Sequence, residues 1–275
     1  MAEEKRITRA QQVNVYFGKC LRIYFNERQW KNLVSTFIII CLVCVVTGPE
    51  MFRSYPETKT GVFAVNCACL WVGLFNSIRS VCRERDIIKR EYRTGLRISS
   101  YITAHVLFES LVCLAEALII LVVVLVRNHA RLPEEKILLS PALDMFVTLF
   151  LVTFASDMIA ILVSSIVKDE NTAMTAMPFV LVVQLVMSGA IFELNGLTLA
   201  VSYFTISRWG QLSMAAIVQT NSVVDLQAQW SEKEGTLAVP GAGHLLGYWG
   251  MLLAFSLLYI GLSVLFLRRV DKDRR

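Results

Sequence analysis

Six apolar stretches, separated by polar segments, restrict the folds that this 275-residue chain can adopt. A helix needs about 20 apolar residues to cross the hydrocarbon core of a bilayer, so a chain of this length has room for six crossings. The stretches cover residues 33–46, 61–78, 99–126, 143–167, 172–192 and 245–267. The sequence therefore predicts an all-α polytopic membrane protein with six transmembrane helices.

The amino-acid composition supports a membrane protein. Hydrophobic residues make up 55% of the chain and charged residues only 18%, whereas soluble domains average about 25% charged residues. This composition excludes a disordered chain and argues against an ordinary soluble enzyme.

The distribution of lysine and arginine predicts the orientation of the helices. Twenty of the 27 Lys and Arg residues lie in the N-terminal segment, the second and fourth connections or the C-terminus, and the other seven lie in the remaining segments. Positive residues concentrate on the cytoplasmic side of membrane proteins. We therefore expect a multi-pass protein of the plasma membrane with both termini in the cytoplasm.

The whole chain, residues 1–275, is predicted to form a single transmembrane domain. Residues 1–31 form a cytoplasmic or interfacial connecting helix, and residues 32–193 hold spans one to five. Residues 194–243 form an outer segment whose apolar pieces, 197–206 and 212–218, are too short to cross. We interpret them as re-entrant or interfacial helices before a polar loop at 227–235. Residues 244–275 contain the sixth span and a cytoplasmic tail.

Residues 10–30 carry an apolar stripe at helical spacing. A helix of this kind typically lies in the membrane interface, with its apolar face inward and its cations at the lipid headgroups. It is either a plain anchor or a lever that connects a cytoplasmic partner to the first span. The stripe consists of Val13, Tyr16, Phe17, Cys20, Leu21, Tyr24 and Phe25.

The segment 82–101 is dense in charges of both signs and predicts a short cytoplasmic helix. Asp86 and Arg90 form an i,i+4 acid-to-base pair, and Gly95 is placed to end the helix. Ile87, Ile88 and Tyr92 give it a small apolar face. It is either a solvated positive loop or a docking surface for a cytosolic protein.

Several polar residues fall inside apolar stretches, among them Glu109, Glu116, Asp157 and Gln184. An ionisable group at membrane depth costs at least about 2.5 kcal/mol, so these side chains should face the bundle interior or water. They either line a translocation path or gate, or hydrogen-bond neighbouring helices, and for Gln184 we favour the second role. A proton relay is a third alternative.

The cysteines and histidines do not indicate a metal site. Seven cysteines lie mostly inside apolar stretches without a C-x-x-C pair, and the three histidines share no ligand spacing. We interpret the cysteines as small buried hydrophobic residues, and no bound metal is expected.

The segment 84–101 resembles the first cytoplasmic loop of ABC transporter permeases of the G-subfamily, or type-2 exporter, kind. That loop has a Glu-Arg pair, an Arg-Glu pair a few residues later, a glycine, and a Ser-x-Tyr that opens the next span. Segments 171–192 and 207–210 resemble the fifth span of that family with its Ser-Gly outer turn, and its tryptophan-bearing segment. The matching residues are Glu84, Arg85, Ile88, Arg90, Glu91, Gly95, Ser99, Tyr101, Ser188, Gly189 and Trp209.

Some positions depart from the family pattern. Ser110 and Leu111 follow Glu109, where family members often have a proline, and no cysteine follows Cys113 to form the outer-loop bridge of animal members. These departures favour a bacterial relative and leave its substrate open.

The resemblance implies a transport subunit that pairs with a second permease copy, identical or different, and uses a separate ATPase. The chain has no G-x-x-x-x-G-K-[ST] phosphate loop, so we expect it to bind no cofactor and to have no enzymatic activity of its own. ATP and Mg²⁺ would bind the partner nucleotide-binding domain, and no nucleic-acid partner is expected. The coupling helix would contact that ATPase through Glu84, Arg85, Ile87, Ile88, Arg90, Glu91 and Tyr92.

The resemblance also implies outward transport or flipping of an amphipathic substrate. The short loop at 168–171 has no room for the Glu-Ala-Ala motif of importers. The path is expected between two copies, near the second and fifth spans. Two alternatives remain: a polytopic membrane enzyme, or a proton-driven secondary transporter that uses the intramembrane carboxylates.

Overall fold

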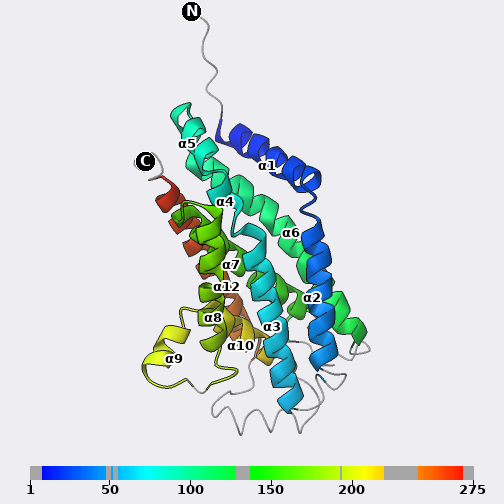
Figure 1. Cartoon of the computed structure of the whole chain (residues 1–275). Helices are drawn as coiled ribbons and strands as arrows, with labels where there is room; N and C mark the ends of the chain where they lie inside the picture. Colours follow the sequence, from blue (N-terminus) through cyan, green and yellow to red (C-terminus); the bar gives the residue numbers. More distant parts are fainter. Residues whose placement is uncertain are drawn as a thin grey trace, which may run out of the picture.

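A computed structural model describes residues 8–47, 51, 55–127, 137–192, 194–219 and 241–268, and these residues form helices and no strand (Figure 1). The helices are α1 (Arg9–Asn26), α2 (Lys31–Thr47), α3 (Tyr55–Ser77), α4 (Ser80–Arg83), α5 (Arg85–Arg93), α6 (Ile98–Arg127), α7 (Pro141–Ile166), α8 (Glu170–Val186), α9 (Leu197–Ser202), α10 (Ile206–Gln219) and α12 (Ala242–Leu267). The all-α fold class is therefore confirmed.

Helix α7 is the centre of the bundle. It packs against α3, α12, α6 and α10, and apolar residues such as Met145, Leu149 and Ile161 are almost completely buried along its length. Ser140 caps its N-terminus by accepting a hydrogen bond from the backbone of Leu143. A helix buried on most sides needs apolar residues around most of its circumference, which explains why the sequence of α7 has no polar face.

A glycine allows a close contact between α3 and α7. A Cβ atom on Gly73 would lie 2.3 Å from the carbonyl oxygen of Thr153 and 2.9 Å from Cβ of Ser156. Three residues earlier on α3, the carbonyl of Leu70 accepts a 2.7 Å hydrogen bond from the hydroxyl of Ser156. Small residues and hydroxyls of this kind let two apolar helices approach closely where both lie in lipid.

All six apolar stretches form helices, and four described segments are long and apolar enough to cross a membrane: Glu57–Arg83, Ile98–Arg127, Pro141–Ile166 and Ala242–Leu267. Helices α1 and α2 pass the same test only as a pair, which is bent by 67°. Helix α8 is apolar but has only 17 residues. The chain is thus a multi-pass membrane protein, and six crossings remain a prediction.

The fifth apolar stretch ends earlier as a helix than the sequence predicts. Helix α8 stops at Val186, six residues before the expected end at Phe192. Gly189 adopts a positive φ of 77°, and the hydroxyl of Ser188 accepts a hydrogen bond from the backbone of Ala190. Glycine adopts a positive φ without steric strain, and the Ser188 hydroxyl supplies a hydrogen-bond acceptor to a backbone N–H outside the helix. Both features favour a turn over continued helix.

The two short apolar pieces before the last span are helical. The first, α9, is shorter than expected, whereas α10 begins earlier and packs against α3, α7 and α12. Asn66 on α3 donates a 2.9 Å hydrogen bond to the carbonyl of Ser207 at the start of α10. The polar loop expected at 227–235 lies outside the described residues.

Helix α1 begins with a capping box, in which Thr8 and Gln11 exchange side-chain-to-backbone hydrogen bonds. Its apolar stripe packs on α6, where Cys20 is buried with Phe108 and Val112. The stripe therefore contacts protein over much of its length.

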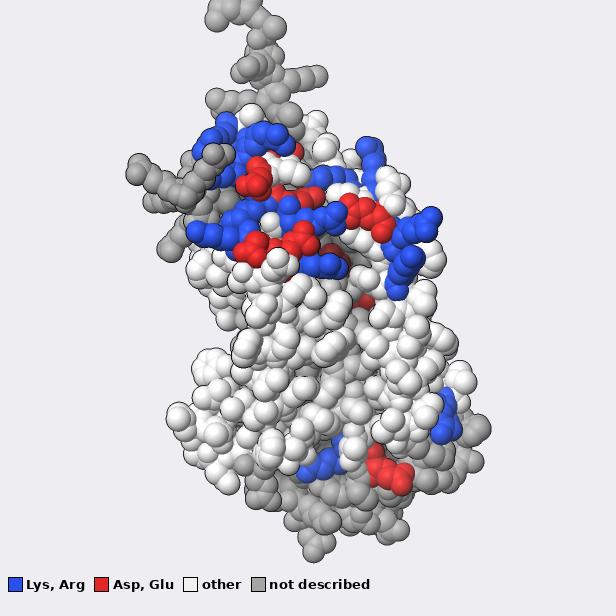
Figure 2. All heavy atoms as spheres, in the orientation of Figure 1, with Lys and Arg blue, Asp and Glu red and all other residues white. Residues whose placement is uncertain are grey.

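Charged side chains gather at one end of the molecule. Figure 2 shows Lys, Arg, Asp and Glu concentrated where α1 and α5 lie in Figure 1, above a belt that is almost free of charge on the visible face. Such a belt beside a positively charged end is typical of a protein whose basic end lies at one membrane surface.

Candidate functional site

Helix α5 lies at the charged end of the bundle and ends where the sequence predicts. Gly95 has a positive φ of 108°, and the backbone N–H of Leu96 donates a 3.0 Å hydrogen bond to the carbonyl of Glu91. This geometry is a glycine stop of the kind that satisfies the last carbonyls of a helix. The predicted cytoplasmic-loop helix is thus present as α5.

Two contacts join α1 to α5 and to Glu84, the residue that precedes α5. Together we call them the α1–α5 contact. The Tyr16 hydroxyl donates a 2.6 Å hydrogen bond to Glu91, and the Lys19 ammonium lies 2.9 Å from Glu84. Burial, together with the adjacent Glu91 carboxylate, raises the pKa of Tyr16 above its ordinary value. The phenol therefore stays protonated and able to donate at physiological pH.

A bidentate ion pair continues this contact toward the end of α1. Both terminal nitrogens of Arg83 donate to the carboxylate of Glu27, at 2.6 and 2.9 Å. The fork geometry matches a carboxylate with two parallel hydrogen bonds. Movement of the segment that carries Arg83 therefore acts directly on α1.

The charged pair at the start of α5 also holds two other parts of the bundle. Tyr101 of α6 donates a 3.0 Å hydrogen bond to Glu84. Arg85 donates to the carbonyls of Ser165 and Val167, at 3.1 and 2.8 Å, where α7 leads into α8. Glu84, Arg85 and Glu91 thus bond within the chain itself, and their contact with a partner remains a prediction.

Only part of the apolar face expected on α5 is accessible for contact with another protein. Ile88 is completely buried in the bundle core, so its proposed role as an anchor in a partner is wrong, because a short helix that packs on a bundle buries its central apolar residue there. Ile87 is half-buried, Tyr92 is 37% exposed, and Arg90 is exposed. Ile87, Arg90 and Tyr92 remain for contact with another protein.

The intramembrane acid Glu116 of α6 is fully buried and hydrogen-bonded to two other helices. Its carboxylate accepts from the Thr36 hydroxyl of α2 at 3.2 Å and from the Asn76 amide of α3 at 2.8 Å. These bonds offset part of the cost of burying a carboxyl group. Glu116 therefore ties α2, α3 and α6 together.

Glu109 and Asp157 meet across α6 and α7. Both are buried, their carboxyl groups are close enough to interact electrostatically, and the Ser77 hydroxyl of α3 lies near both. Neither carboxylate oxygen of Asp157 makes a hydrogen bond of normal geometry in the described part of the chain. The structure thus brings Glu109, Glu116 and Asp157 into one polar region between α3, α6 and α7.

Gln184 lies apart from these acids. Its side-chain oxygen accepts a 3.1 Å hydrogen bond from the backbone of Ser207, and its carbonyl accepts from the hydroxyl of the same serine. The residue joins α8 to α10 in the way expected of an interhelical contact. Ser188 and Gly189 form the turn that follows α8, described above.

Sequence reasoning missed the residues that hold these groups. Tyr16, Lys19 and Glu27 were not recognised as partners of the charged segment, nor Asn76 and Ser77 as partners of the acids. Two features of the sequence indicate these partners. Tyr16 and Lys19 are three apart and share a face of their helix, and Asn76 and Ser77 are polar residues at the end of an apolar stretch.

Taken together, the fold and the site define a multi-pass helical membrane protein that has a short charged helix at one end and no extramembrane domain in its described part. Residues 19–218, well over half of the chain, match the family described as ABC-2 type transporter, and the chain belongs to this family. It is a permease subunit of an ABC transporter, in a family whose members are transport subunits that work with ATP-binding subunits.

A similar protein is an ABC transporter ATP-binding/permease protein of Mycobacterium tuberculosis. The two are 27% identical over 205 residues, which is 72% of this chain and 23% of that relative. The chain therefore spans about a quarter of the length of the relative, whose name covers an ATP-binding and a permease part.

Proposed function

We propose that this chain is the membrane half of an ATP-driven exporter that moves or flips an amphipathic substrate outward. Residues 1–275 act as one permease domain, which pairs with a second permease copy. ATP and Mg²⁺ bind a nucleotide-binding domain, which is a separate subunit or a part fused to the native protein. The ABC-2 family match supports the transport role, and the absence of a phosphate loop from the printed sequence supports the separate ATP site.

The contacts of α5 carry this proposal. Residues 84–91 are bound to α1, to α6 and to the junction of α7 and α8. A displacement of α5 therefore acts on three parts of the bundle through charge-assisted hydrogen bonds, which are shorter and stronger than neutral ones. This is the connectivity that a helix needs if it passes motion from an ATPase to the membrane.

The charge distribution supports a cytoplasmic position for α5 and for both termini. Twenty of the 27 Lys and Arg residues lie in segments assigned to that side. Three residues, 167–169, connect α7 to α8, and Asp169 caps α8 by accepting from the backbone of Thr172. Such a short connection favours export, since it leaves no room for an importer-type coupling loop.

The test is reconstitution with the ATP-binding subunit, comparing ATP hydrolysis with and without the permease. Arg90→Glu should abolish the stimulation, because the exposed cation would be replaced by an anion at the proposed docking surface, whereas Arg90→Lys should retain it. Tyr92→Ala should reduce stimulation by removing the exposed aromatic contact.

Both substitutions change exposed side chains and should leave the amount of folded protein unchanged in size-exclusion chromatography. If Arg90→Glu and Tyr92→Ala stimulate hydrolysis like the wild type, α5 is not the coupling helix. If no ATP-binding subunit is stimulated by the wild type, ATP-driven transport by this chain is rejected.

A further inference from the structure

Three buried carboxyl groups lie between α3, α6 and α7 without a cation to balance them. Glu109 and Glu116 of α6 and Asp157 of α7 are at most 6% exposed, and Glu109 acts electrostatically on the other two. In the described part of the chain no lysine, arginine or histidine acts on any of the three. If all were ionised, the region would hold three negative charges at membrane depth, where even one is costly.

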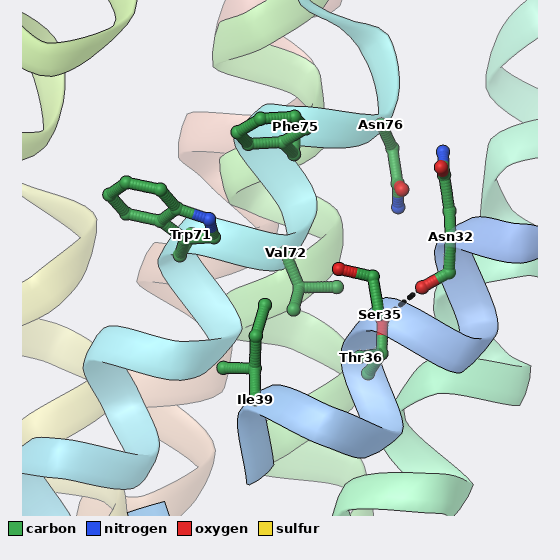
Figure 3. Close-up of a pocket in the computed structure, with 8 residues that line it drawn as sticks. All are labelled: Asn32, Ser35, Thr36, Ile39, Trp71, Val72, Phe75 and Asn76. Atoms are coloured by element: carbon green, nitrogen blue, oxygen red, sulfur yellow. Dashed lines mark hydrogen bonds between the residues drawn. The ribbon is translucent and has the colours of Figure 1, made fainter. Parts of the chain in front are cut away.

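One of these acids, Glu116, already has its hydrogen bonds. Thr36 of α2 and Asn76 of α3 donate to its two oxygens, at 3.2 and 2.8 Å. Both donors line a pocket of about 50 Å³ between α2 and α3 (Figure 3), which has room for a few water molecules. Glu116 therefore has a donor for each carboxyl oxygen, and water has room beside these donors.

Glu109 and Asp157 lack such donors. Asp157 is fully buried, and neither of its carboxyl oxygens has a hydrogen bond of normal geometry within the described residues. Ser77, the last residue of α3, lies near both acids, but its buried hydroxyl is also without a hydrogen bond of normal geometry there. One hydroxyl has only one hydrogen to donate. The pair is therefore short of at least one proton for a hydrogen bond.

We propose that Glu109 and Asp157 bind one proton between them, so that the protonated carboxyl group donates a hydrogen bond to the other. Two carboxylates in one buried site disfavour each other's charge. A single bound proton removes one negative charge and supplies the missing donor, and it needs no cavity between two packed helices. This proton-binding site goes beyond the proposed function and does not depend on it.

The other titratable groups around the pair supply no positive charge. Cys20 and Tyr24 of α1 and Cys113 of α6 are close enough to Glu109 to interact with it electrostatically. His105, one turn before Glu109, contacts Cys20 instead. Among the described residues, the other helices packed on α6 and α7 add only the third acid and the serine named above. The third acid adds negative charge, which increases the pair's affinity for a proton.

The two helices that carry the pair are both held at the start of α5. Glu84 accepts a hydrogen bond from Tyr101 of α6, and Arg85 donates to the carbonyl of Ser165 on α7. A displacement of α5 that parted α6 from α7 would also part the two carboxyl groups, and the shared proton would lose one of its two acceptors. Proton binding therefore favours the packed arrangement of α6 and α7.

The experiment is infrared spectroscopy of the full chain at about pH 7 in dodecyl maltoside, a detergent without carbonyl groups. A protonated carboxyl group has a C=O stretching band that a carboxylate lacks and that shifts in D₂O. The wild type should show this band and lose it on unfolding, because exposed carboxyl groups are ionised at this pH. Glu109→Gln/Asp157→Asn should lose most of the band, and the matched control Glu116→Gln should retain most of it.

The pH dependence of stability is the second readout. The folded protein holds a proton that the unfolded chain releases above about pH 5, so the free energy of unfolding falls as pH rises. The shared proton should lower the folding equilibrium constant of the wild type about tenfold per pH unit in this range. The double amide variant should lack this part of the pH dependence.

Several outcomes would overturn the inference. They are an unchanged band in the double variant, a band that only Glu116→Gln removes, and equal pH dependence of the wild type and the double variant. If the double variant does not fold, absence of the band from the folded wild type decides against the proton. Replacement of choline by Na⁺ at equal ionic strength tests the rival ligand, and loss of the band with a higher melting temperature in Na⁺ would show a cation site instead.

These measurements use no ATP-binding subunit and therefore separate this inference from the proposed function. Stimulated ATP hydrolysis by a chain without the band would reject the proton site and retain the exporter. A band with the expected variant pattern, in a chain that stimulates no ATP-binding subunit, would retain the proton site and reject the exporter.

Discussion

At the scale of single residues, Gly73 sets the distance between α3 and α7. We predict that Gly73→Ala lowers the free energy of unfolding by about 1–3 kcal/mol, because the new methyl group would meet backbone atoms that cannot move without separating the helices. Thermal unfolding in detergent measures the effect.

Gly250→Ala on α12 is the control for Gly73, because a Cβ atom there would have no neighbour within 4 Å. It should leave the melting temperature unchanged or slightly raised, since alanine favours helix over glycine. Equal melting temperatures for the two variants would show that α3 and α7 do not pack as tightly as described.

A second prediction at this scale concerns the stability of Glu116 variants. Glu116→Leu should destabilise the protein by about 1–3 kcal/mol, because it removes the acceptor of the half-buried Asn76 amide and of the buried Thr36 hydroxyl. Glu116→Gln should cost less, since an amide oxygen can still accept one of the two bonds. Unfolding in denaturant, monitored by tryptophan fluorescence, distinguishes the two, and an equal loss for both would contradict a hydrogen-bonding role.

The sequence predicted part of this polar region. Glu109 and Glu116 are seven residues apart, which places them on nearly one face of α6, and both are indeed buried. Their partners Thr36, Asn76 and Asp157 could not be predicted, because they depend on how α2, α3 and α7 rotate and slide against α6. Whether the acids line a path remains a prediction.

At the scale of helices, the ion pair between α4 and α1 gives a charge-reversal test. Arg83→Glu alone places two carboxylates together and should raise hydrogen exchange in α1. The effect on global stability should be small, about 0.2–1 kcal/mol, because the two side chains are 50% and 39% exposed.

The double variant Glu27→Arg/Arg83→Glu restores opposite charges and should recover most of the protection in α1. Hydrogen exchange with mass spectrometry on α1 peptides compares the three proteins. If the double variant exchanges as fast as the single variant, the pair does not hold α1 against the charged segment.

The sequence predicted helix α5 and its glycine stop, but only part of its surface. Ile88 was assigned with Ile87 and Tyr92 to an apolar face that contacts the ATPase, whereas it lies in the bundle core. Which of them faces the bundle is set by tertiary contacts such as the bonds of Arg85 to Ser165 and Val167. Periodicity alone does not contain that information.

At the scale of the whole molecule, the positions of the long helices were predictable because an apolar stretch in lipid has few alternatives to a helix. The six stretches all became helices, and the main errors lie at their ends, as at Val186 of α8. The central position of α7 and the sharp bend before α2 depend on packing between segments that are distant in the sequence. Local sequence patterns do not predict such packing.

The orientation is tested by epitope tags at the two termini. Both tags should be accessible in inverted membrane vesicles and protected in intact cells, because the basic residues are concentrated in the segments assigned to the cytoplasm. A tag inserted near residue 230, in the expected outer loop, is the opposite control. Protection of one terminal tag alone in inverted vesicles would contradict an even number of crossings, and protection of both tags would contradict the cytoplasmic orientation.

The unequal lengths of α6 and α8 have a consequence for the surrounding lipid. The 30 residues of α6 and the 17 residues of α8 give lengths of about 45 and 25 Å, against a hydrocarbon core of about 30 Å. Helix α6 must tilt or project from the bilayer. If α8 crosses the bilayer as predicted, the bilayer beside it thins or flanking side chains reach back to the interface. A molecule that crosses along α8 would therefore travel a shorter apolar distance than one that crosses along α6.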